Sequence, residues 1–270
     1  MPDMLSEERA RYLRKRARSK RAVLAAQAVL LILIFVLWEA AARRRWIDPF
    51  ITSSPSRIWK TFRNLYASGD LFRHLGVSCL ETVAGFSLGT LIGTAIAVLL
   101  WWFPALRRVL DPYLVVLNSL PKTALGPIFI VWMGAGPGAI IAMTLAISLI
   151  VTILEVLNGF GSVDTGKISL MKTLGASRAQ ILTKLVIPAN AATFVNALKV
   201  NVGLSWVGVI MGEFLVSRAG LGYLIVYGSQ VFKMDLVMAT VILLLIAAAG
   251  MYQGVLLLEK AMKKHLGVSA

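Results

Sequence analysis

Six long apolar runs constrain the fold of this chain more than any other feature. They cover residues 22–42, 77–101, 112–133, 137–157, 196–216 and 236–258. An α-helix needs about 20 apolar residues to cross a bilayer. Lipid offers the backbone no hydrogen-bond partners, so each run is expected to be helical. The sequence therefore predicts an all-α polytopic membrane protein with six transmembrane helices.

Composition excludes several other classes of protein. Of the 270 residues, 58% are hydrophobic, which is more than a soluble domain of this length can bury. The net charge of +15 lies in tails and loops between the apolar runs, so it indicates membrane topology and no nucleic-acid partner. The single cysteine, Cys79, and two distant histidines, His74 and His265, offer no disulfide framework and no metal or catalytic centre.

Charge placement predicts the orientation. The segment before the first run is rich in basic residues, and these are Arg9, Arg11, Arg14, Lys15, Arg16, Arg18, Lys20 and Arg21. They place the N-terminus in the cytoplasm, and six spans return the C-terminus to the same side. The cluster Arg43–Arg45 lies outside and weakens the bias, but the first span usually dominates orientation. We therefore predict a multi-pass protein of the cell (inner) membrane with both termini cytoplasmic.

The chain divides into four parts on this topology. We assign residues 1–21 to a basic cytoplasmic tail, 22–76 to the first span with an external amphipathic segment, 77–258 to the transmembrane core, and 259–270 to a cytoplasmic tail. Within the second part, residues 55–68 predict an amphipathic helix that begins at Pro55. Ile58, Phe62 and Leu65 share one face, which is expected to lie on the membrane surface.

A polar, basic insertion at 164–188 interrupts the core on the cytoplasmic side. Asp164 can cap a first helix that Gly175 ends, and Ser177 can cap a second helix that Pro188 closes. The second helix carries an apolar stripe at helical spacing, formed by Ile181, Leu182, Leu185 and Val186. These features predict a short helical elbow, apolar toward the bundle and polar at its tip. Such an elbow can pass motion from a soluble partner to the spans; the alternative is an interfacial helix without a partner.

The second half of this elbow resembles a known pattern. The stretch KTLGASRAQILTKLVIP at 172–188 is similar to the motif of binding-protein-dependent ABC importer permeases: Glu-Ala-Ala, three residues, Gly, nine residues, then Ile-x-Leu-Pro. Gly175 occupies the glycine position, and residues 185–188 match the closing element conservatively. Ser-Leu-Met at 169–171 replaces the leading Glu-Ala-Ala.

Three further stretches resemble the nitrate/sulfonate/taurine group of these permeases: IDPFITSSPSRIW, LNSLPKTALGPIFIVWMGAG and GEFLVSRAGLGYLI. The resemblance covers about residues 46–260. It implies a type I ABC importer permease-like fold and a pathway for a small anionic solute such as a sulfonate, nitrate or a vitamin-precursor-like compound. The implied partners are a second permease copy, a cytoplasmic ABC ATPase dimer and an external solute-binding protein, besides membrane lipid.

In this family the elbow is the coupling helix, which docks in a groove of the ATPase. The resemblance assigns this docking role to Leu174, Gly175, Ala176, Ser177, Arg178 and Gln180. The chain itself has no GxxxxGK[ST] stretch, so ATP and Mg are expected on the partner subunit, and the permease is expected to have no cofactor and to be no enzyme.

Polar residues within the spans are candidates for the translocation pathway, because such groups usually face a bundle interior or a wet cavity. Lys122 follows Pro121, which marks a kink or unwound turn, and Asn118, Ser119 and Thr123 lie nearby. A cation in this polar notch would suit an anionic solute. Alternatively, Lys122 extends to the cytoplasmic boundary and packs its stem on apolar neighbours.

The fifth run carries a second polar group. Asn201 and Ser205 share a helical face, where they either line a pore or bond a neighbouring helix. Lys199 is expected to reach the membrane boundary or to meet a carboxylate, and Glu213 to have a structural role. The same run carries the small residues Gly203, Gly208 and Gly212, which favour close helix packing.

Two rival functions fit the sequence less well than a permease. An ion-gradient-driven secondary transporter needs a mid-membrane ion site and usually has repeated halves, whereas this sequence shows no internal repeat. An intramembrane enzyme needs clustered catalytic side chains, which two dispersed histidines do not supply.

Overall fold

The structure is a computed structural model that describes residues 2–265, and these residues form helices and connecting loops without strands. The helices are α1 (Pro2–Arg43), α2 (Pro49–Thr52), α3 (Pro55–Ser68), α4 (Asp70–Trp102), α5 (Pro104–Ser119), η1 (Lys122–Leu125), α6 (Gly126–Met133), α7 (Pro137–Gly161), α8 (Thr165–Thr173), α9 (Arg178–Ile181), η2 (Leu182–Val186), α10 (Ile187–Ala189), α11 (Ala191–Val216), α12 (Leu221–Gln230) and α13 (Met234–His265). The all-α prediction is confirmed.

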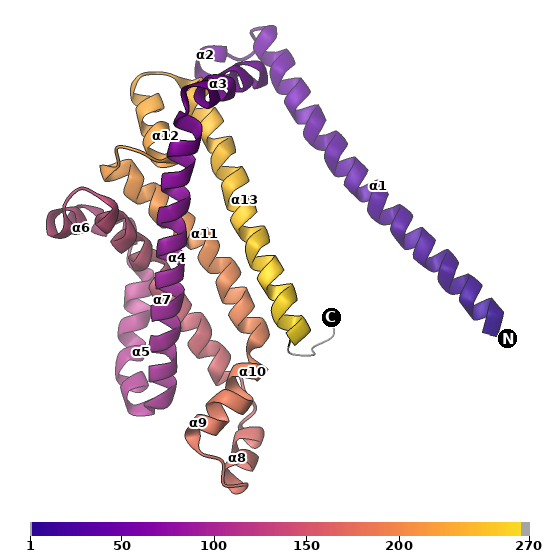
Figure 1. Cartoon of the computed structure of the whole chain (residues 1–270), viewed down its shortest axis with the longest axis vertical. Coiled ribbons are helices and arrows are strands. Elements are labelled where there is room, and N and C mark those ends of the chain that lie inside the picture. The colour runs from indigo at the N-terminus through magenta and orange to yellow at the C-terminus, as the bar shows by residue number, and fades with distance from the viewer. Residues whose placement is uncertain (1, 266–270) are drawn as a thin grey trace.

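Helix α7 lies at the centre of the bundle, between α4 and α11 (Figure 1). Its close approach to both neighbours depends on small residues. A Cβ at Gly208 of α11 would lie 2.5 Å from the Cα of Thr144, and one at Gly85 of α4 would lie equally close to the Thr144 side chain. Gly212 likewise packs against α7, whereas Gly203 faces open space. The packing role is therefore confirmed for Gly208 and Gly212 and is wrong for Gly203.

Helix α1 stands away from this bundle and approaches the rest of the chain at α2 and α3 (Figure 1). None of the most apolar stretch of its span, within 21–43, is buried by the chain. The basic segment 2–21 continues this span as one helix, and of the predicted C-terminal tail, residues 266–270 lie outside the described residues. Figure 1 shows the start of α1, the end of α13 and the α8–α9 elbow on one side, opposite α2, α3 and α12.

Within residues 2–265, five helices are long and apolar enough to cross a membrane, and a bent pair of helices could form a sixth crossing. The span predicted at 112–133 is a broken pair: α5 begins earlier, at Pro104, and a bend of 90° separates it from the η1–α6 arm. The break occurs where the sequence indicates it. Pro121 has no N–H to donate, and it holds Leu120 in an extended conformation.

The predicted amphipathic helix at 55–68 is confirmed as α3. However, its apolar face packs on protein, and the expectation that this face lies on the membrane surface is wrong. Ile58 and Leu65 are buried, and Phe62 joins an apolar cluster with residues of α4, α11 and α13. An ion pair of 2.8 Å between Arg57 Nη2 and Asp235 Oδ2 holds α3 at the start of α13.

Candidate functional site

The elbow consists of α8, a tight turn and α9, and it protrudes from the bundle below α7 and α11 (Figure 1). The Asp164 carboxylate accepts a hydrogen bond from the Gly166 N–H at 2.7 Å, so it caps α8 as predicted. Gly175 has φ +78°, and the N–H groups of Gly175 and Ala176 donate to Lys172 and Met171. This pattern is a Schellman motif, in which a left-handed glycine ends the helix.

The second leg begins with a reciprocal cap. The Gln180 N–H donates to Ser177 Oγ at 3.3 Å, and the Ser177 N–H donates to Gln180 Oε1 at 2.8 Å. Such a capping box satisfies two backbone donors that a helix start leaves free. Ser177 and Gln180 therefore fix the geometry of the turn, whatever else they contact.

The second leg ends one residue after the predicted Pro188, which lies inside its last turn. Because Pro188 has no N–H, the α-helical bond to Lys184 cannot form, and the chain passes through the π-helical turn η2, where the Ile187 N–H donates to Leu182 O. The chain stays helical to Ala189. Buried Asn190 then donates from Nδ2 to Val186 O at 2.9 Å, and α11 follows directly.

The second leg is anchored in the bundle, whereas the tip of the elbow is open. The predicted apolar stripe packs into the core, where Ile181, Leu182 and Val186 are buried with residues of α4 and α7. The prediction of a polar tip is only partly confirmed, because two apolar side chains, Leu170 and Leu174, are 60% and 74% exposed there. These two leucines, one helical turn apart, give the otherwise polar tip a small exposed apolar patch.

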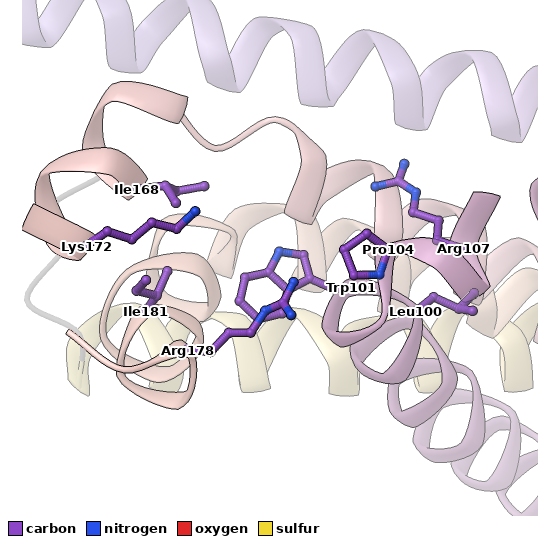
Figure 2. Close-up of a pocket in the computed structure, with 8 residues that line it drawn as sticks. All are labelled: Leu100, Trp101, Pro104, Arg107, Ile168, Lys172, Arg178 and Ile181. Carbon is purple, nitrogen blue, oxygen red and sulfur yellow. The ribbon is translucent and has the colours of Figure 1, made fainter. Parts of the chain in front are cut away.

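Arg178 faces the bundle from the start of the second leg. Its guanidinium carbon lies 5.7 Å from the centre of the Trp101 ring, at the end of α4 (Figure 2). A guanidinium over an indole face is a favourable cation–π contact. The elbow thus joins α7 and α11 through the backbone and contacts α4 through this side chain.

The second group of candidates gathers at the α5–α6 break. The Lys122 ammonium donates to Asn118 O at 2.8 Å, and Ser119 Oγ donates to Val115 O at 3.1 Å. The break deprives the Asn118 carbonyl of its helical donor, and Lys122 supplies a replacement. Asn118, Ser119 and Thr123 are exposed on this chain.

The surroundings of this break are apolar and uncovered. Val116, Val131 and Trp132 are between 66% and 83% exposed. The polar break therefore lies in an apolar face that the rest of the chain does not cover.

Asn201 and Ser205 lie elsewhere, buried where α11 meets its neighbours. Asn201 Nδ2 donates to Thr90 Oγ1 of α4 at 2.6 Å, so of its two predicted uses it makes the bond to a neighbouring helix. Lys199 meets a carboxylate, as expected, in a 2.7 Å ion pair between its Nζ and Glu259 Oε2.

At the end opposite the elbow, Glu213 holds the turn between α11 and α12. Its carboxylate accepts from Ser78 Oγ and from the Gly222 N–H, both at 2.5 Å. The Gly220 N–H donates to His74 Nδ1 at 2.9 Å. The structural role predicted for Glu213 is confirmed, but the sequence alone did not reveal His74 and Ser78, because these partners are more than 130 residues distant.

Comparison with known proteins identifies the class. Residues 89–264 match the family model described as the binding-protein-dependent transport system inner membrane component. This match covers well over half of the chain, so the chain belongs to that family. It is a multi-pass membrane protein and a permease subunit of an ABC transport system, and the secondary-transporter alternative finds no support.

Three relatives show the range of the group. The putative aliphatic sulfonates transport permease SsuC of Bacillus subtilis is 26% identical over 96% of this chain and 94% of its own length. The formylaminopyrimidine transport permease ThiX of Halalkalibacterium halodurans is 28% identical over 71% of this chain and 76% of its own length. The taurine transport system permease TauC of Escherichia coli is 23% identical over 81% of each chain.

Proposed function

We propose that two copies of this chain form the pathway of an importer for a small anionic solute. An external binding protein delivers the solute, and a cytoplasmic ABC ATPase dimer binds and hydrolyses ATP. The observation that carries this proposal is the elbow. It has a buried leg fixed to the bundle core and a tip with two exposed leucines, Leu170 and Leu174.

The elbow is built to transmit force between these partners. Its first leg follows α7 after a three-residue connection, and its second leg leads through η2 and α10 into α11. Arg178 adds a contact to α4 at Trp101. An ATPase that grips the tip therefore moves the central helices directly, and ATP-driven closure brings the elbows of two copies together.

The solute class rests on the relatives and on the polar break. Two relatives are named for the transport of aliphatic sulfonates and of taurine, and a sulfonate group is an anion. Lys122 supplies a cation at the uncovered α5–α6 break, beside Asn118, Ser119 and Thr123. We propose that this break faces the pathway between the two copies, whereas Asn201 and Ser205 remain inside the bundle, where Asn201 bonds α4.

A crosslinking experiment tests the coupling role. A photo-reactive benzoylphenylalanine replaces Leu174 in the full chain, and the membrane complex is irradiated. We expect a covalent product with a protein whose peptides contain GxxxxGK[ST], because Leu174 projects from the tip. The same residue at Ser68 of α3 is the control and yields no such product. Crosslinks from position 174 to lipid alone contradict the proposal.

A further inference from the structure

A cavity of about 260 Å³ lies between the elbow and the junction of α4 with α5 (Figure 2). Three cationic side chains border it, each from a different helix: Arg107 of α5, Lys172 of α8 and Arg178 of α9. None of the coupling contacts described above uses Arg107 or Lys172. The cavity therefore adds two cations, Arg107 and Lys172, to the Arg178–Trp101 contact.

The charge around this cavity is unbalanced. One carboxylate approaches it, that of Asp111, whose Oδ2 lies 3.7 Å from Arg107 Nε. Among the described residues, no ion pair is found for Lys172 or Arg178. Three cations opposed by one partly exposed carboxylate create a positive potential that favours an anion.

The floor of the cavity is apolar. Leu100 and Ile181 are buried there, and Ile168 and Trp101 are partly buried. A free phosphate would leave this surface unused, whereas a phospholipid covers it with its glycerol and upper acyl carbons. The volume is below the roughly 300–1,000 Å³ of pockets for whole drug-sized ligands, and it suits a headgroup.

The position along α4 also favours a lipid. Trp101 and Trp102 end this apolar helix, and tryptophan is enriched at the level of lipid headgroups. Basic pockets between transmembrane helices on the cytoplasmic side are a recurring form of anionic-lipid site. Phosphate groups there meet both charge and hydrogen-bond donors from arginine.

We propose that an anionic phospholipid of the cytoplasmic leaflet places its phosphodiester between Arg107, Lys172 and Arg178. The bound headgroup joins the two legs of the elbow to the α4–α5 junction, so it stiffens the connection that carries force. The choice of leaflet rests on the proposed function, which places the elbow in the cytoplasm. The binding of the lipid to this cavity does not depend on that function.

Native mass spectrometry of the delipidated full chain tests the site. Phosphatidylglycerol is titrated against phosphatidylcholine of the same acyl composition. We expect selective retention of phosphatidylglycerol, and about fivefold weaker binding for Arg107→Gln and for Lys172→Gln, because one basic residue near anionic lipid contributes about 1 kcal/mol. The double variant is expected to lose selectivity.

Two matched variants serve as controls. Arg108→Gln removes an exposed cation next to Arg107 that does not border the cavity, so phosphatidylglycerol binding should be unchanged. Asp111→Asn removes the opposing carboxylate and keeps all three cations, so binding should be equal or stronger. Equal unfolding temperatures of all variants show that lost binding is not lost folding.

Other outcomes overturn the proposal. Displacement of phosphatidylglycerol by millimolar inorganic phosphate would identify a site for free phosphate. Unchanged lipid selectivity with loss of the copurifying ATPase in the double variant would show that the cavity receives an acidic surface of that partner. Lipid binding is measured without transport, so the two proposals can fail separately. Absence of lipid binding would not contradict the import function, and absence of import would not contradict lipid binding.

Discussion

At the scale of single residues, Lys122 combines two roles that mutation can separate. Its ammonium satisfies the Asn118 carbonyl, and its charge lies at the uncovered break. We predict that Lys122→Met lowers uptake of an aliphatic sulfonate at least tenfold, equivalent to about 1.4 kcal/mol, while membrane insertion is unchanged. Lys122→Arg should be intermediate, because it keeps the charge but not the shape.

Substitution by glutamine isolates the charge in this test. Lys122→Gln keeps a hydrogen-bond donor and removes the cation, so its uptake should resemble that of Lys122→Met. Uptake is measured in cells with equal amounts of permease in the membrane. Normal uptake by the methionine and glutamine variants would show that Lys122 only supports the α5–α6 break.

Gly220 is a residue whose replacement should affect stability. Its φ is +115°, and a Cβ there would collide with the Glu213 carboxylate. We predict that Gly220→Ala costs about 2–4 kcal/mol, from backbone strain and overpacking together, and lowers the thermal unfolding temperature of the purified chain. Gly203→Ala is the control, because a Cβ at this helical position meets no atom within 4 Å. Equal unfolding temperatures for both variants would contradict the prediction.

At the scale of elements, the sequence predicts what neighbouring residues determine. The caps at Asp164 and Ser177 were predictable, because each side chain bonds a backbone N–H two or three residues away. The start of α5 was not predictable from hydropathy. Its first turns contain Arg107, Arg108 and Asp111, and these charged residues fall outside the apolar run. The π-helical turn before Pro188 was missed because the choice between a break and a wider turn depends on packing against the core.

The turn at Gly175 provides a test of the whole elbow. Its left-handed backbone disfavours β-branched residues by roughly 1–2 kcal/mol, while open space around it admits a side chain. We predict that Gly175→Val misaligns the tip, so import falls and ATP hydrolysis no longer responds to solute-loaded binding protein. Gly175→Asn is the matched control and should retain most import, because asparagine tolerates this conformation. Normal coupled transport by the valine variant would refute the assignment.

At the scale of the whole molecule, one chain leaves two extended apolar surfaces uncovered. The most apolar stretch of the α1 span is unburied, and the α5–α6 face exposes Val131 and Trp132. The sequence predicts which segments are apolar, but it cannot say whether lipid or a second copy covers them, since both are apolar. The helices could therefore be predicted from the sequence, whereas the residues that face the pathway could not.

Orientation is the property on which the molecule-scale proposals depend. The elbow, the start of α1 and the end of α13 lie on one side of the structure and α3 on the other (Figure 1). The basic residues of the N-terminal segment predict that the first side faces the cytoplasm. Ser177 and Ser68 are exposed on these opposite sides. In a Cys79→Ser background, we predict that Ser177→Cys reacts with an impermeant maleimide only in inside-out vesicles, and Ser68→Cys only in intact spheroplasts. The reverse pattern would place the elbow outside the cell, where no ATPase could reach it.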